Sequence, residues 1–313
     1  RPLIYALFRA VLDAGEKVVY PVPSWNNNHY CHLAGAVGVA VETSAETGFQ
    51  PTAGCLAPHL ADARLLALNS PLNPAGTGFA REQLKAIAQL VVDENRRRGP
   101  AAKPLFLLYD QIYWLLADDS APHITPVELV PEVAPYTLMI DGISKAFAAT
   151  GLRVGWAIGP PFLISRMKDF LGHVGAWAPR PEQVATAELF ADPALVHALS
   201  GAVREGVNLR LAALDRGLTR LAEKGYPVKH LPPTGALYLS VHFDLIATGG
   251  RFENNRAIRQ YLLEQAGFAV VPFHAFGTRA DNGWFRLSVG AVGVDEIAPA
   301  IDRVEAALAA CLS

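Results

Sequence analysis

Six short apolar runs, separated by longer segments with helical periodicity, make up the first half of the sequence. Strand-like runs that alternate with helices are typical of parallel βαβ units, because a parallel neighbour is reached only through a crossover connection. We therefore predict an α/β domain with a mostly parallel sheet that is covered by helices on both faces. The six predicted strands, all expected to be buried, cover 17–23, 36–43, 64–70, 104–110, 137–142 and 153–159.

The pattern changes beyond about residue 200. A long helical segment at about 194–224 is followed by strands and helices without regular alternation, which indicates a separate α+β region. We predict a large domain over residues 1–203 and a smaller C-terminal α+β domain over residues 204–313. The chain opens at Arg1 directly in an amphipathic helix pattern, so we expect that an N-terminal segment is missing from it.

Composition restricts the classes of function. The chain of 313 residues is 51% hydrophobic and 18% charged, so it can bury a large core. Its formal net charge of −2 argues against nucleic-acid binding, which needs a concentrated basic face. No apolar run has the length of a membrane span, and three cysteines without CxxC spacing indicate free thiols in a reducing cytoplasm. The HYCH segment at 29–32 lacks a second cluster of ligands, so we expect no metal site.

Polar residues follow four of the predicted strands. Asn73 lies in the turn-rich segment NSPLNPAGTG and Asp110 ends the fourth strand. Lys145 follows the fifth strand, and Arg153 opens the sixth. An isolated aspartate at a strand end is usually a turn or cap residue, and both cations could simply extend to water. However, a doubly wound sheet gathers the carboxyl ends of its strands into one crevice, where ligands bind. We therefore predict that these residues converge on one site.

The order of these motifs resembles the fold-type I, pyridoxal-phosphate-dependent aminotransferases of class I and II, the family that includes aspartate aminotransferase. The stretches that carry the resemblance are VPSWNNNHY (22–30), LNSPLNPAGTGF (68–79), YDQIYW (109–114), ISKAFAATGLRVGWAIGP (143–160) and WFRLSVG (284–290). The resemblance covers essentially the whole chain and begins partway through the family's domain. It implies transfer of an amino group from an amino acid to a 2-oxo acid by a ping-pong route that uses pyridoxal 5′-phosphate.

The resemblance implies a role for each residue around the cofactor ring. Lys145 would form the internal Schiff base and move the proton, since a desolvated amine can attack a carbonyl. Asp110 would pair with the pyridine nitrogen and keep it protonated. Asn73 and Tyr113 would hydrogen-bond the phenolic oxygen of the ring, and Trp25 would stack on the ring.

Two arginines are expected to bind anionic groups. By resemblance, Arg153 would hold the cofactor phosphate, and Arg286 would bind the substrate α-carboxylate beside Asn73. Many relatives have a serine three residues before the lysine as a phosphate ligand, where this chain has Gly142. Ser144 is therefore predicted to contribute to the phosphate site instead.

Several alternatives remain open from the sequence. A lyase or decarboxylase could use the same scaffold, because fold and cofactor do not determine the reaction. An aminotransferase-like effector domain of a transcriptional regulator would carry a DNA-binding domain upstream. A folded protein without this chemistry would have to match five stretches in order by chance. The resemblance also implies a homodimer, whereas the side chain of the amino donor stays undetermined.

Overall fold

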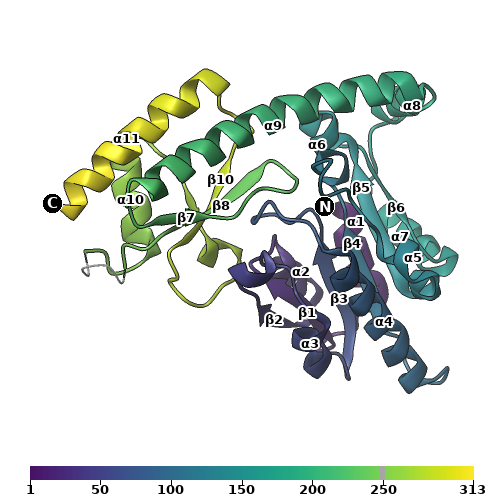
Figure 1. Cartoon of the computed structure of the whole chain (residues 1–313). Helices are drawn as coiled ribbons and strands as arrows, with labels where there is room; N and C mark the ends of the chain where they lie inside the picture. Colours follow the sequence, from purple (N-terminus) through teal and green to yellow (C-terminus); the bar gives the residue numbers. More distant parts are fainter. Residues whose placement is uncertain (247–250) are drawn as a thin grey trace.

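The computed structural model describes residues 1–246 and 251–313 and contains two sheets (Figure 1). The strands of the first sheet are β1 (Lys17–Val22), β2 (Val37–Glu42), β3 (Ala63–Asn69), β4 (Phe106–Asp110), β5 (Thr137–Gly142) and β6 (Gly155–Ile158). Their order is β2-β1-β3-β4-β5-β6, and all neighbours are parallel except β5 and β6. The predicted α/β fold with a mostly parallel sheet is confirmed.

The prediction that all six strands are buried is wrong for the two edge strands. β2 and β6 each have one neighbour, and both are partly exposed; Ile158 of β6 is 56% exposed. Between β5 and β6 the chain forms only α6 (Ile143–Ala146) and the 3-10 turn η5 (Thr150–Leu152). This connection contains too little helix to return the chain for a parallel pairing, so β6 runs antiparallel to β5.

Helices cover both faces of the first sheet, because successive strand residues point to opposite sides. One face packs against α1 (Pro2–Val11), α2 (Asn27–Ala34) and α7 (Pro161–Val174). The other packs against α3 (Ala53–Leu56), α4 (Arg81–Arg98) and the segment that follows α5 (Pro126–Leu129). In α4 the buried residues include Leu84, Ile87, Ala88 and Val91, whose spacing places them on one face of the helix.

The second sheet is antiparallel and has the order β7-β8-β10-β9. It consists of β7 (Val228–His230), β8 (Tyr238–Phe243), β9 (Val271–Pro272) and β10 (Trp284–Ser288). Its core is shared with α9 (Pro193–Glu223), α10 (Asn255–Ala266) and α11 (Val294–Leu312). Figure 1 shows α9 extending from α8 (Arg180–Phe190), beside the first sheet, to the second sheet. The domain boundary predicted at residues 203 and 204 falls inside α9 and stays a prediction.

The turn after β3 docks onto the second sheet. The Ser240 hydroxyl donates to the Ala75 carbonyl (2.9 Å), and the Thr234 N–H donates to the Gly76 carbonyl (2.8 Å). Gly76 has φ +76°, and a Cβ there would lie 2.1 Å from the Tyr238 carbonyl oxygen. Only glycine permits this approach, which fixes the turn that carries Asn73 against the strand that carries Tyr238.

Among the residues described, no helix is both long enough and apolar enough to cross a bilayer.

Candidate active site

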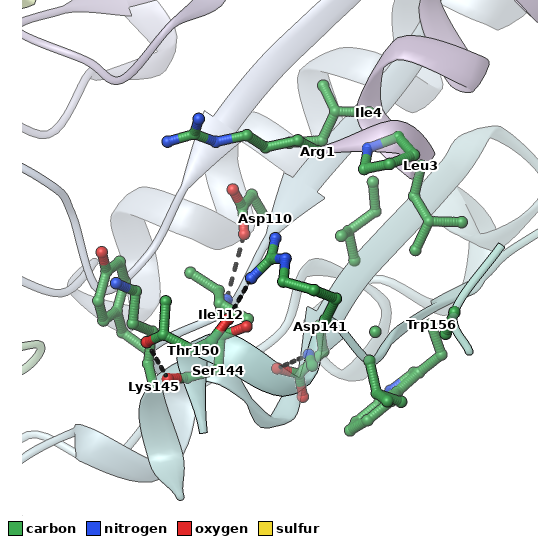
Figure 2. Close-up of a pocket in the computed structure, with 18 of the residues that line it drawn as sticks. Arg1, Leu3, Ile4, Asp110, Ile112, Asp141, Ser144, Lys145, Thr150 and Trp156 are labelled. Atoms are coloured by element: carbon green, nitrogen blue, oxygen red, sulfur yellow. Dashed lines mark hydrogen bonds between the residues drawn. The ribbon is translucent and has the colours of Figure 1, made fainter. Parts of the chain in front are cut away.

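A cavity of about 1530 Å³ lies at the carboxyl ends of β3, β4 and β5, beside β8 and β10. This is the edge where ligands bind in open α/β sheets. The structure brings together in its wall all eight residues predicted for the site: Trp25, Asn73, Asp110, Tyr113, Ser144, Lys145, Arg153 and Arg286. Figure 2 shows Asp110 and Lys145 among the residues of this wall.

Asp110 presents a largely buried carboxylate at the end of β4. Its Oδ1 accepts a hydrogen bond from the Ile112 N–H (3.2 Å), and its own carbonyl accepts from the Asn69 side chain (2.8 Å). Burial raises the pKa of Asp110 to about 6, since the charged form is poorly solvated. A cationic N–H placed in the cavity would relieve this cost.

Lys145 projects from α6 as a half-buried amine. Its Nζ lies 5.9 Å from the centre of the Tyr113 ring, and no carboxylate within the described residues pairs with it. Burial lowers the pKa of the Lys145 amine, and neighbouring arginine charges including Arg286 and Arg153 lower it further. An amine that loses its proton more easily is a better nucleophile and base.

The loop between Lys145 and β6 carries Arg153 and is hydrogen-bonded to α6 at Ser144. Arg153 ends η5 in the left-handed region (φ +60°), a conformation that costs about 1 kcal/mol for a residue with a Cβ. Its guanidinium is exposed at the cavity and donates to the Thr150 carbonyl (2.5 Å). The Thr150 hydroxyl donates to the Ser144 carbonyl (3.0 Å), which ties this loop to α6 (Figure 2).

Arg286 lies in an aromatic cage. Its guanidinium carbon is 4.6 Å from the ring centre of Tyr238, 5.0 Å from that of Phe276 and 6.0 Å from that of Trp25. One terminal nitrogen donates to the Asn73 side-chain oxygen (3.0 Å). The buried Nε has no hydrogen-bond partner in the described part of the chain. The fork therefore keeps donors for an anion, and a planar carboxylate matches its geometry.

Two aromatic residues complete the predicted set. The Tyr113 hydroxyl lies 2.8 Å from the Tyr238 hydroxyl, and burial raises the pKa of Tyr113 well above its usual range, so it stays protonated. Trp25 is 42% exposed, with its ring 5.9 Å from that of Phe276. A tryptophan kept only for core packing would be more deeply buried.

Tyr238 and Asp141 also line the cavity and are not among the residues predicted from the sequence. Asp141 is buried beside α6, its Oδ1 accepts from the Gly142 N–H (2.7 Å; Figure 2), and burial raises its pKa to about 7. The N–H of Gly142 is thus already engaged. An acidic residue near the end of a buried strand was the available signal for Asp141.

Comparisons with known proteins agree with one another. The sequence profile described as aminotransferase class I and II matches residues 1–304. The chain is 32% identical over 310 residues to the aspartate aminotransferase of Streptomyces avermitilis, covering 96% of this chain and 71% of that protein. It is 28% identical over 305 residues to the aspartate aminotransferase of Bacillus sp. strain YM-2, covering 97% and 73% of the two chains.

Solved aminotransferase structures are also similar to this chain. The aspartate aminotransferase of Thermus thermophilus with maleate superposes with a TM-score of 0.85 at 30% identity, covering 98% of this chain and 73% of that one. The aromatic aminotransferase of Pyrococcus horikoshii also gives 0.85 at 28% identity, covering 98% and 76% of the respective chains.

Proposed function

The chain belongs to the class I and II aminotransferase family and is an aminotransferase of this pyridoxal-phosphate-dependent group; from this premise we propose its reaction and the roles of its residues. The amino group passes from an amino acid to a 2-oxo acid in a ping-pong reaction, and Lys145 links covalently to the cofactor. The observation that supports this best is the Lys145 amine, half-buried and without an acidic partner in the described chain, in one cavity with Asp110 and Arg286.

The donors of the cavity fit pyridoxal phosphate. Asp110 is a desolvated carboxylate that a protonated ring nitrogen would satisfy, and Tyr113 is a neutral hydroxyl suited to a ring oxygen, together with the Asn73 amide. Arg153 offers an exposed guanidinium for the phosphate, with Ser144 nearby on α6. When bound, the cofactor supplies an electron sink that stabilises negative charge at the substrate α-carbon.

Four residues of the chain would then have separate roles. Arg286 grips the α-carboxylate of amino acid and 2-oxo acid alike, which fixes the α-carbon relative to Lys145. The Lys145 amine would take the proton from the substrate α-carbon and pass it to the C4′ carbon of the cofactor, and its lowered pKa favours the uncharged amine that this transfer needs. Asp110 would stay ionised and pair with a protonated ring nitrogen. Trp25 would stack on the ring and exclude water.

We propose further that the active form is a homodimer. Large apolar side chains stand exposed on β6, α7 and the segment that leads to α8: Ile158, Phe162, Val174 and Trp177. Trp177 is 65% exposed and also lines the cavity. A second copy that covers this surface would close the site as well.

The first experiment is to mix the purified protein with pyridoxal phosphate and record its visible absorbance. We expect a band that borohydride traps on Lys145 in peptide mapping. Lys145→Ala should abolish the adduct, whereas Lys168→Ala, an exposed lysine on α7, should leave it unchanged. No band, or an adduct on another lysine, would contradict the proposal.

Screening aspartate, aromatic and aliphatic donors then identifies the substrate. Stoichiometric return of the amino group to a 2-oxo acid separates an aminotransferase from a lyase.

A further inference from the structure

Tyr238 connects the two ends of the cavity. It is 5% exposed on β8, its hydroxyl lies 2.8 Å from the Tyr113 hydroxyl, and the Arg286 guanidinium stacks 4.6 Å from its ring centre. One side chain thus contacts both the phenol on the cofactor side and the cation on the carboxylate side. None of the roles assigned above uses it.

The geometry of the tyrosine pair is tightly constrained. Tyr113 is 4% exposed, and the two rings meet edge to face, with centres 5.5 Å apart and planes at 73°. The backbone of Tyr238 is fixed by pairing with Ser288 of β10 and by close contact with Gly76. The hydroxyl of Tyr238 therefore cannot move far from that of Tyr113 without disturbing the sheet.

We propose that Tyr238 is a positioning residue. Its hydroxyl donates a hydrogen bond to the Tyr113 oxygen, and the strength of this bond changes when a carboxylate binds Arg286. This inference rests on the proposed function, in which Tyr113 serves the cofactor and Arg286 the substrate. Each phenol has one proton, so Tyr113 can donate toward the ring oxygen only if it accepts from Tyr238. The Tyr238 bond then orients the Tyr113 proton into the cavity.

The stacked cation sets the strength of this bond. A guanidinium over the face of Tyr238 withdraws electron density and makes its hydroxyl a stronger donor. A bound carboxylate neutralises Arg286 and weakens the donation, so occupancy of the substrate site changes the hydrogen bonding of Tyr113. The charged groups that face the pair are Arg286 from β10, Asp110 from β4 and Lys145 from α6.

The primary test needs no cofactor. Tyrosine labelled with ¹³C at Cζ reports the hydrogen bonding of each phenol by NMR, and comparison with Tyr113→Phe assigns Tyr113. We expect propionate, titrated to saturation, to shift the Tyr113 resonance in the wild type. In Tyr238→Phe the shift should fall to about half or less, since only the direct field of Arg286 remains. Tyr261→Phe removes one hydroxyl hydrogen bond on α10, to the Ala307 carbonyl, and should keep the full response.

A second measurement uses the holoenzyme. Propionate should move the midpoint of the pH titration of the visible band in the wild type, and less so in Tyr238→Phe. In a Tyr113→Phe background, Tyr238→Phe should have no further effect, because Tyr238 acts through Tyr113. Additive effects of the two substitutions would overturn the inference.

The outcomes separate this inference from the proposed function. An equal NMR response in wild type and Tyr238→Phe, or none in the wild type, overturns the relay, even if the visible band is normal. A normal NMR result without a visible band refutes the cofactor proposal but leaves the link between Arg286 and Tyr113. If Tyr238→Phe does not fold, site-specific Tyr238→3-fluorotyrosine, a stronger donor, should shift the Tyr113 resonance in the opposite direction to propionate. No shift overturns the relay.

Discussion

At the scale of single residues, the buried carboxyl groups dominate the electrostatics of the site. Asp110 and Asp141 lie on neighbouring strands, and burial raises the pKa of both, to about 6 and about 7. The folded chain therefore keeps protons that the unfolded chain releases near pH 4. Their contribution to stability is fully present below that pH and is lost as the pH rises through 6 to 7.

This effect predicts a pH-dependent response to Asp110→Asn in the chain without cofactor. Between pH 5 and pH 7.5, the unfolding free energy of the wild type should fall by about 1 kcal/mol more than that of the variant. Urea unfolding at the two pH values measures the difference. Asp169→Asn, an exposed residue on α7, should follow the wild type. Parallel changes in wild type and Asp110→Asn would show that Asp110 does not titrate in this range.

The eight site residues could be predicted from the sequence because they lie in recognisable local motifs. Lys145, Asp110 and Arg286 each lie in a short stretch whose order along the chain is informative. Tyr238 could not be found in this way, because its position matters through contacts with residues distant in the chain: Tyr113, 125 residues earlier, and Arg286. Only the fold brings the two together.

At the scale of elements, the close approach of β5 to β6 determines which side chain fits at position 142, three residues before Lys145. A Cβ on Gly142 would lie 2.7 Å from the Val154 carbonyl oxygen and 3.0 Å from the Gly155 Cα. Both contacts are backbone atoms of the adjoining strand region, so they cannot yield like a flexible side chain. A serine hydroxyl at this position would be gained only by displacing β6.

We therefore predict that Gly142→Ser lowers the free energy of unfolding by about 2 kcal/mol, as overpacking of a close contact does. It should also weaken cofactor binding, because α6 and Lys145 would shift with it. Thermal unfolding and a pyridoxal phosphate titration measure the two effects. Gly172→Ser, on α7, is the control, since a Cβ there meets no atom within 4 Å. Tighter cofactor binding by Gly142→Ser would mean that the added hydroxyl reaches the phosphate.

Hydrophobic runs were sufficient to locate the strands, but not to rank their burial. Whether a strand is central or at an edge depends on the spatial order β2-β1-β3-β4-β5-β6, which differs from the chain order. The exposed pattern of β2 and β6 follows from that order. Local composition alone therefore could not predict the exposure of these two strands.

At the scale of the whole molecule, the cavity is assembled from both sheets. Asn73 follows β3 and Asp110 ends β4 of the first sheet, whereas Tyr238 and Arg286 belong to the second. The turn at Gly76 holds the two together at a glycine-only contact. The bond between Asn73 and Arg286 crosses this junction, so the placement of the proposed carboxylate site depends on the junction.

The proposed homodimer predicts the mass of the protein in solution and the effect of a substitution at Trp177. Trp177 is the most exposed of the large apolar side chains and adjoins the cavity, and burying such a side chain at an interface contributes roughly 2 kcal/mol or more. We expect sedimentation equilibrium to give twice the 33.6 kDa of one chain, and Trp177→Ala to raise the dimer Kd about tenfold or more. Leu263→Ala, exposed to 44% on α10, should leave the Kd unchanged. A monomeric wild type would contradict the dimer, and equal effects of the two substitutions would place the interface elsewhere.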